Sequence, residues 1–276
     1  MTTIHPAIAA GNVAVITGGA NGIGFAVAKR LATLGMKIVL ADRDSEELAL
    51  AAGELGEVVT VETDVSDLAS VQALAAFVAD RLGPVSVLMN NAGHGGGGDA
   101  LSNPEGWARV LGTNLFGVLH GVQTFVPAMV ESDRPGLVIN TGSKQGITQP
   151  PGDTAYNVSK SGVKALTEGL AHTLREKTGG RITAHLLIPG FTYTGIMKKH
   201  FAEQPAAAWT PDQVAETALD GIGRGSFYLW CLDNESSREQ DEKRVLWHAQ
   251  DMIEDRPALS RWHPDYKNAF ADFMKG

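Results

Sequence analysis

Short runs of apolar, often β-branched residues alternate along the chain with longer segments in which apolar residues recur every three or four positions. The first pattern predicts strands and the second predicts helices, for example over residues 23–34 and 68–82. Runs such as 85–89 are apolar at almost every position, which is typical of strands buried on both faces of a sheet. The expected strands cover residues 13–17, 37–41, 58–62, 85–89, 136–141, 183–188 and 227–231.

This alternation predicts an α/β fold: a single Rossmann-type, doubly wound domain with a seven-stranded parallel sheet flanked by helices. Asp67 and Thr210 are expected to cap helices, with Pro211 at a first helical position. We interpret residues 1–276 as one domain with a core of about 11–232 and a C-terminal extension of about 233–276, part helical and part irregular.

Composition and charge narrow the classes of partner. The chain has 276 residues, of which 43% are hydrophobic, and its net charge of −8 argues against a nucleic-acid partner or an anionic membrane surface. Residues 1–12 lack the pattern of a signal peptide, and no apolar run approaches the ~20 residues of a membrane span. A single cysteine, Cys231, lies in an apolar run and is expected to be a buried thiol. We therefore expect a soluble protein of the cytoplasm, a reducing compartment.

A glycine-rich turn follows the first expected strand directly and leads into a helical pattern. Glycines in this context allow the backbone to approach a pyrophosphate, which the free N–H groups of the helix N-terminus then bind. The alternative is an ordinary glycine-rich strand–helix turn. The turn residues expected to bind a dinucleotide are Gly18, Asn21, Gly22, Ile23 and Gly24.

Asp42 closes the second expected strand, eighteen residues after Gly24. A carboxylate at this place accepts hydrogen bonds from both ribose hydroxyls of NAD and repels the 2′-phosphate of NADP. The adjacent Arg43 would favour NADP instead, because a guanidinium pairs with a phosphate. Asp42 occupies the discriminating position, so we expect NAD as the cofactor, in preference to NADP.

Tyr156 and Lys160 are one helical turn apart, and Ser143 precedes the tyrosine by thirteen residues. A phenol with a reference pKa of ~10 is a poor base at neutral pH, and a lysine ammonium beside it favours the phenolate. Ser143 would donate a hydrogen bond to a substrate oxygen on which negative charge develops. This pattern predicts proton transfer by Tyr156, coupled to transfer of a hydride between an alcohol or ketone and the nicotinamide.

Together these motifs resemble the short-chain dehydrogenases/reductases over residues 11 to about 232. The resemblance implies an alcohol dehydrogenase or ketoreductase that acts on a small-molecule secondary alcohol or ketone. The family's motifs here are the glycine turn, Asn90–Gly93, Asn114, Ser143, Tyr156 with Lys160, and Pro189-Gly190.

The resemblance also implies roles for further residues. Asn114 would hold a water that links Lys160 to solvent, whereas Asn90 would be structural. Tyr156 and Lys160 would contact the cofactor as well as the substrate. The other residues expected along the cofactor are Asp64 and Val65 at the adenine, Asn91, Ala92 and Gly93 in the cleft, and Pro189, Gly190, Thr192 and Thr194 at the nicotinamide end.

The substrate pocket is expected in the loops 94–98, 144–152 and 191–209, where Phe191, Tyr193 and Trp209 supply aromatic character. Lys144 would pair with an anionic substrate group or, more often for such a lysine, point into solvent. His94 and His185 are expected to be hydrogen-bonded loop or strand residues, and no spacing of histidine, cysteine and carboxylate suggests a metal site.

Assembly and the extension complete the expectations. The family usually forms homotetramers, or dimers, and here the pairing would use helices 105–131 and 154–177 and the seventh strand. Within the extension, 233–244 should be a solvated, ion-paired segment and 245–256 a helix. Its aromatic residues should pack on a neighbouring subunit or along the cleft rim, or else fold back far from the site; they are Trp247, Trp262, Tyr266, Phe270 and Phe273.

Two other function classes stay open on the sequence. A dinucleotide-binding regulator keeps the fold without the chemistry, but it does not need an intact set of Asn114, Ser143, Tyr156 and Lys160. Epimerases and dehydratases of the same type share the tyrosine and lysine but usually carry a larger substrate domain, whereas only about forty residues follow the seventh expected strand.

Overall fold

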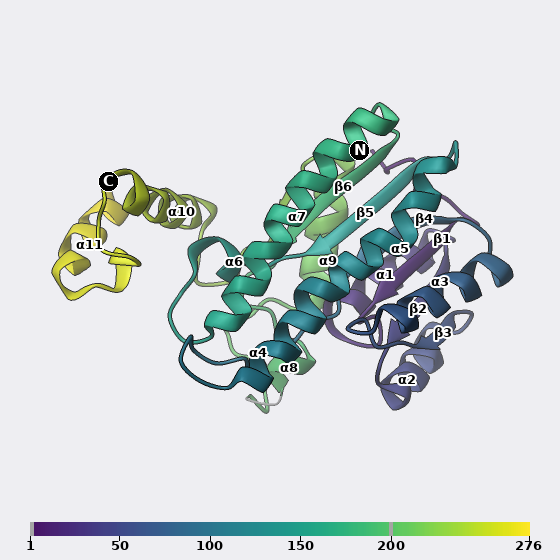
Figure 1. Cartoon of the computed structure of the whole chain (residues 1–276), viewed down its shortest axis with the longest axis horizontal. Coiled ribbons are helices and arrows are strands. Elements are labelled where there is room, and N and C mark those ends of the chain that lie inside the picture. Colours follow the sequence, from purple (N-terminus) through teal and green to yellow (C-terminus); the bar gives the residue numbers. More distant parts are fainter. Residues whose placement is uncertain (1–2, 199–200) are drawn as a thin grey trace.

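The computed structural model describes residues 3–198 and 201–276, and it shows a central sheet of parallel strands between two layers of helices (Figure 1). The strand order is β3-β2-β1-β4-β5-β6-β7, as expected for a doubly wound sheet. The strands are β1 (Val13–Thr17), β2 (Lys37–Asp42), β3 (Val59–Glu62), β4 (Val85–Asn90), β5 (Gly136–Thr141), β6 (Ile182–Ile188) and β7 (Tyr228–Trp230).

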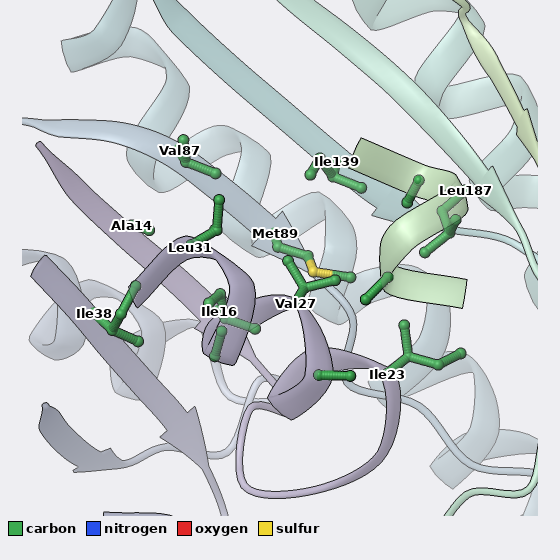
Figure 2. Packing of buried hydrophobic residues seen from close by; sticks show 14 of the residues in the cluster. Ala14, Ile16, Ile23, Val27, Leu31, Ile38, Val87, Met89, Ile139 and Leu187 are labelled. Atoms are coloured by element: carbon green, nitrogen blue, oxygen red, sulfur yellow. The ribbon is translucent and has the colours of Figure 1, made fainter. Parts of the chain in front are cut away.

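Alternate residues of the buried strands face opposite helical layers. On one side, the even-numbered positions of β1, such as Ala14 and Ile16, pack with α1, α2 and α9. Figure 2 shows Ile23, Val27 and Leu31 of α1 over this face. These helices are α1 (Gly22–Thr33), α2 (Ser45–Leu55) and α9 (Pro211–Gly223).

On the other side, Val13 and Val15 of β1 pack with α3 (Leu68–Arg81), α5 (Gly117–Glu131) and α7 (Thr154–Thr178). The helix expected over 105–131 is divided in the structure. It consists of α4 (Pro104–Leu111), a π-helical turn (Gly112–Phe116) and α5, and this interruption could not be read from an apolar pattern that continues through it.

Local sequence signals set several of the helix ends. The Asp67 carboxylate accepts a hydrogen bond from Ala69 N–H at 2.9 Å and caps α3. Thr210 and Gln213 form a reciprocal capping box at the start of α9, with Pro211 as the first helical residue. Both predicted caps are therefore confirmed.

The extension forms a separate arm that stands away from the sheet in Figure 1. It contains α10 (Arg238–Ile253), two 3₁₀ turns (Ser260–Trp262 and Pro264–Tyr266) and α11 (Lys267–Lys275). The prediction of a solvated segment over 233–244 is wrong in part, because α10 begins at Arg238 and Asp241 is buried. The charged residues belong to the same helix as the apolar ones.

Trp247, Phe270 and Phe273 pack together within the arm. Trp247 is buried, and its ring lies 5.3 Å from that of Phe270 and 5.2 Å from that of Phe273. The guanidinium of Arg256 lies over the Trp247 ring, 4.1 Å from its centre. The indole N–H of Trp247 donates to Ser260 Oγ at 2.8 Å. The arm thus has a small core of its own.

Candidate active site

The carboxyl ends of the strands surround a cleft of about 890 Å³, at the place where the chain order reverses between β1 and β4. A crevice at such a switch point is the usual ligand site of a doubly wound sheet. The loops expected to form the site meet here. The predicted residues that line the cleft are Gly18, Asn21, Gly22, Ile23, Asp42, Arg43, Asp64, Val65, Asn91, Ala92, Gly93, Ser143, Tyr156, Lys160, Pro189, Gly190, Thr192 and Thr194.

The glycine turn is held against the loop after β4. Gly18 has a φ of +60°, and a Cβ there would lie 2.7 Å from Cα of Ala92. Gly24 is not among the cleft residues. It lies behind the turn, where a Cβ would come within 2.5 Å of the Gly18 carbonyl oxygen. Only glycine fits either position, so the turn's shape follows from its sequence.

The first turn of α1 opens onto the cleft without a side-chain cap. Asn21 holds the N-cap position, but its side chain makes no capping hydrogen bond. By contrast, Asp44, Asp67 and Asp153 each cap the helix that follows them. Free N–H groups and the positive end of the helix dipole together suit an anion. The residues present therefore fit the pyrophosphate of a dinucleotide.

Asp42 lies at the end of β2 and is half-buried at the cleft wall. One carboxylate oxygen accepts the Ala20 N–H and the other the Asp44 N–H, each at 3.3 Å. These two backbone contacts fix the carboxylate at the edge of the glycine turn. Arg43 next to it is exposed and lies near Asp64.

Asp64 and Val65 form the wall beyond Asp42. The Asp64 carboxylate accepts hydrogen bonds from the hydroxyl and N–H of Ser66, at 2.7 and 2.9 Å. The Ser66 hydroxyl, with a smaller contribution from Arg43, lowers the pKa of Asp64 below its usual value. This carboxylate is thus held by its own turn.

The Asn91 side chain links the loop after β4 to the ends of β1 and β5. Its amide donates to the carbonyl oxygens of Thr17 and Gly18, at 3.2 and 3.0 Å, and accepts from Thr141 Oγ1 at 3.2 Å. Asn90, predicted to be structural, is buried and donates to Asn140 Oδ1 at 2.8 Å. The side chains of this motif hold the loop after β4 in place, while Ala92 and Gly93 line the cleft.

Ser143, Tyr156 and Lys160 converge on the cleft from β5 and α7. The Lys160 ammonium lies 5.7 Å from the centre of the Tyr156 ring. Burial raises the pKa of Tyr156 above its ordinary value; a hydrogen bond with the Ser143 hydroxyl opposes this effect, and the Asp153 carboxylate adds to it. The structure therefore brings together the three residues that the sequence predicted to act as a group.

Lys160 is only 3% exposed, and its ammonium donates to the Thr141 carbonyl oxygen at 2.8 Å. Loss of hydration lowers its pKa from 10.5 to about 8. A lysine in this setting exchanges a proton closer to neutral pH than an exposed lysine does.

Asn114 lies in the π-helical turn, fully buried behind the cleft rather than on its wall. Its amide donates to the His94 carbonyl oxygen at 2.9 Å and to Ser159 Oγ at 3.2 Å, and its oxygen accepts the His94 N–H at 2.9 Å. A Cβ on Gly93 would lie 3.2 Å from the Asn114 amide oxygen and 3.5 Å from Lys160 Nζ. Asn114 thus holds the loop that runs past the lysine. The predicted water at this residue stays a prediction.

The loop after β6 carries the predicted nicotinamide-end residues. The Thr192 hydroxyl donates to the Gly190 carbonyl oxygen at 3.1 Å, and the Gly190 N–H donates to the Cys231 carbonyl oxygen at 3.1 Å. Cys231 itself is buried, and burial raises the pKa of its thiol to about 12, which confirms the inert role expected for it.

The expectation of three aromatic side chains at the pocket is corrected. Of the three aromatics expected at the pocket, only Phe191 lines the cleft. Trp209 packs against the core, and the Tyr193 hydroxyl donates hydrogen bonds to backbone carbonyl oxygens. Residues 199 and 200 of the same loop lie outside the described part. His94 and His185 are hydrogen-bonded to backbone oxygens, as predicted.

Lys144 neither points into solvent nor stands free for a substrate. Its ammonium lies 2.9 Å from Asp233 and 2.6 Å from Asp241, and its side chain is 15% exposed. Sequence reasoning missed this link because the partners are about ninety residues away along the chain. Of the aromatic residues of the extension, Trp262 lines the cleft, as one of the alternatives for the extension predicted. The structure adds Trp230, Asp233, Asp241, Arg244 and Arg261 to the cleft wall.

Comparisons with known proteins agree with this geometry. The family model of the short chain dehydrogenases matches residues 12–205. The chain is 34% identical to the 3-oxoacyl-acyl-carrier-protein reductase of Thermotoga maritima, over 79% of this chain and 85% of that protein. It is 31% identical to the 1-deoxy-11-beta-hydroxypentalenate dehydrogenase of Streptomyces avermitilis, over 86% and 90%.

A solved structure resembles it closely as well. The short chain dehydrogenase/reductase from Burkholderia phymatum, in complex with NAD, superimposes with a TM-score of 0.81 at 36% identity, over 90% of this chain and 96% of that one. The chain therefore belongs to the short-chain dehydrogenase family. It is an oxidoreductase that transfers hydride between an alcohol or ketone and a nicotinamide cofactor.

No helix in the described ranges is long and apolar enough to cross a membrane.

The buried ammonium of Lys160 should be visible in the pH dependence of stability. Between pH 8 and 10.5 the folded chain has lost a proton that the unfolded chain still holds, so raising the pH through this window favours the folded state. Below it, both states are protonated and the folded state bears the full penalty of burial. Relative to a Lys160→Met variant, the wild type should gain about 1.4 kcal/mol in free energy of unfolding for each pH unit.

Urea titrations of both proteins at about pH 7 and about pH 10 measure this gain. Lys164→Met, an exposed change on the same helix, is the control that should lack it. An equal difference between wild type and Lys160→Met at the two pH values would contradict the expectation.

Proposed function

We propose that the chain is an NAD(H)-dependent dehydrogenase or reductase of secondary alcohols and ketones in which Tyr156 is the acid–base group. The observation that carries the proposal is the convergence of Ser143, Tyr156 and Lys160 in one cleft with an uncapped helix N-terminus and a glycine turn. Each of these features is separately common, whereas their meeting in one cleft serves both proton transfer and dinucleotide binding.

In the oxidative direction, Tyr156 accepts the proton of the substrate hydroxyl, and in the reductive direction it returns this proton to the developing alkoxide. When bound, the nicotinamide ring of the cofactor takes or gives the hydride. Ser143 donates a hydrogen bond to the substrate oxygen while its charge changes. The ammonium of Lys160, 5.7 Å from the ring centre, stabilises the phenolate form of Tyr156, and the hydrogen bond with Ser143 opposes the burial that raises the pKa of this phenol.

Asn114 acts in this scheme by holding the backbone of His94, and with it the loop beside Lys160. The roles proposed for the cofactor-binding residues follow from their order along the cleft: the glycine turn and α1 for the pyrophosphate, Asp64 and Val65 for the adenine, and residues 189–194 for the nicotinamide.

The alternatives are less well supported. A regulator without chemistry gives no reason for Tyr156 and Lys160 to share a buried site with Ser143. The chain is similar to a reductase and to a dehydrogenase, which favours this chemistry over that of an epimerase or dehydratase.

Replacement of Tyr156 by phenylalanine should lower kcat by ~10²–10⁴-fold, because it removes the group that transfers the proton. Binding of NADH, followed by its fluorescence, should be retained. Tyr228→Phe is the matched control. The Tyr228 hydroxyl also donates a hydrogen bond, to the Glu168 carboxylate, but this residue lies outside the cleft. Near-normal turnover by Tyr156→Phe on a ketone that the wild type reduces would exclude this mechanism.

The position of Asp42 supports NAD(H) over NADP(H). A half-buried carboxylate opposite a 2′-phosphate should reduce kcat/KM for NADP by at least ~10-fold relative to NAD. Asp42→Ala should narrow this ratio, since Arg43 is then free to pair with the phosphate. Steady-state rates with both cofactors measure the ratio, with Asp44→Ala as the control for a neighbouring charge. Equal kcat/KM values for the two cofactors in the wild type would refute the preference.

We also propose a homo-oligomer, a tetramer or dimer, in the cytoplasm. Large apolar side chains are exposed on each element expected at the interface: Phe116 on the π-helical turn, Val158 on α7 and Tyr228 on β7. Pairing through these elements would cover them. Light scattering of the purified chain should give the mass of two or four copies of 29.2 kDa; a monomer at micromolar concentration would refute the proposal.

A further inference from the structure

The arm builds one wall of the cleft, on the side of Ser143. Helix α10 contacts the short helix α6 (Gln145–Thr148), which begins two residues after this serine. The cleft residues here are of two kinds, aromatic and cationic. Trp230 and Trp262 supply flat apolar surface, and Arg244 and Arg261 supply positive charge.

The charges at this wall do not cancel. Asp233 and Asp241 are both engaged by Lys144, and Arg244 lies 2.9 Å from Asp241. Two carboxylates thus face two cations. Arg261 adds a third cation, close enough to Arg244 for the two to repel each other.

Arg261 has no hydrogen-bonded or ion-paired acid among residues 3–198 and 201–276. Its guanidinium instead lies 4.7 Å from the ring centre of Trp262 and 5.2 Å from that of Phe270. The side chain is half-buried; burial and the nearby Arg244 lower its pKa from the ordinary value, and the charge of Asp241, which is not in hydrogen-bond contact with it, partly opposes them. Folding therefore holds a partly desolvated cation at the cleft without an acid of its own.

We propose that Arg261, with Arg244 beside it, binds a carboxylate of the substrate. The substrate class is an alcohol or ketone with an apolar, preferably aromatic, body and a carboxylate at the end remote from the reacting carbon. A guanidinium offers two parallel N–H donors that match the two oxygens of a carboxylate. The tryptophans beside it would contact the apolar body. This inference deepens the proposed function and rests on it.

Lys144 is excluded from this role, although it stands next to Ser143. Both of its neighbouring carboxylates already neutralise it, so a substrate acid would have to displace Asp233 or Asp241. Arg244 is less available to a ligand than Arg261, because it pairs with Asp241 and also donates to Ser236 Oγ at 2.7 Å. Arg261 is the cation of this wall that gains most from an acidic ligand.

The test compares matched ketones that differ only in charge: para-acetylbenzoate against para-acetylbenzamide, and their homologues with longer chains between the ring and the acid or amide. At least one acid should exceed its amide by about tenfold or more in kcat/KM, mostly through KM, since a charge-assisted hydrogen bond is lost with the amide. Arg261→Gln should abolish this preference by lowering the rates on the acids to those on the amides. Arg261→Lys, which keeps the charge without the fork, should retain part of it.

Lys267→Gln is the control, because it removes a positive charge from the same arm outside the cleft. Equal rates on acids and amides throughout the wild-type series would overturn the inference and leave the proposed function standing. Equal loss on acids and amides in Arg261→Gln would also overturn it, since that result means that Arg261 only holds the arm together.

Failure of the proposed function is recognised separately, as absence of turnover on every ketone with either cofactor. In that case, calorimetric titration with the acid and amide of each pair still decides the matter. Tighter binding of an acid that disappears in Arg261→Gln supports the site, and equal binding of acids and amides overturns it.

Discussion

The close approach of two backbone segments, at Gly18 and Ala92, is the constraint on which the site depends. A Cβ on Gly18 would lie 2.7 Å from Cα of Ala92, so the loop after β1 and the loop after β4 touch without side chains between them. Asn91 and Thr141 extend this contact to β5, the strand that ends just before Ser143. A shift of any of these strands would move the glycine turn relative to Ser143. The buried apolar residues on both faces of the sheet resist such shifts, because close-packed layers slide only at the expense of their contacts.

Much of the fold was predictable because its signals are local. The seven strands are runs of apolar residues, and the caps at Asp67 and Thr210 act within three residues. The cleft residues from the glycine turn, Asp42 and the Tyr156–Lys160 pair were likewise found, since each sits at the carboxyl end of a strand or on the helix that follows. The π-helical turn was not predicted, because the apolar pattern of the neighbouring helices continues through it.

What could not be predicted depends on contacts between distant parts of the chain. The ion pairs of Lys144 with Asp233 and Asp241 join the loop after β5 to the arm. Nothing in the sequence around either partner indicates that the two segments meet. The same holds for Arg261, whose place at the cleft follows from how the arm folds around Trp247 and turns back through the 3₁₀ segments. Asn114 was identified, yet its hydrogen bonds to His94 depend on a loop twenty residues earlier.

The arm's small core has a consequence for how this protein diversifies. Because Trp247, Phe270 and Phe273 pack among themselves, part of the arm's stability comes from contacts within the arm, while Asp233 and Asp241 tie it to Lys144. Substitutions at its cleft-facing positions other than Asp233 and Asp241, which pair with Lys144, can accumulate without loosening the strands around Tyr156. With the proposed role of the arm, recognition of the substrate and the chemistry performed on it fall to different segments of one chain, and a duplicated gene could acquire a new substrate by altering the arm.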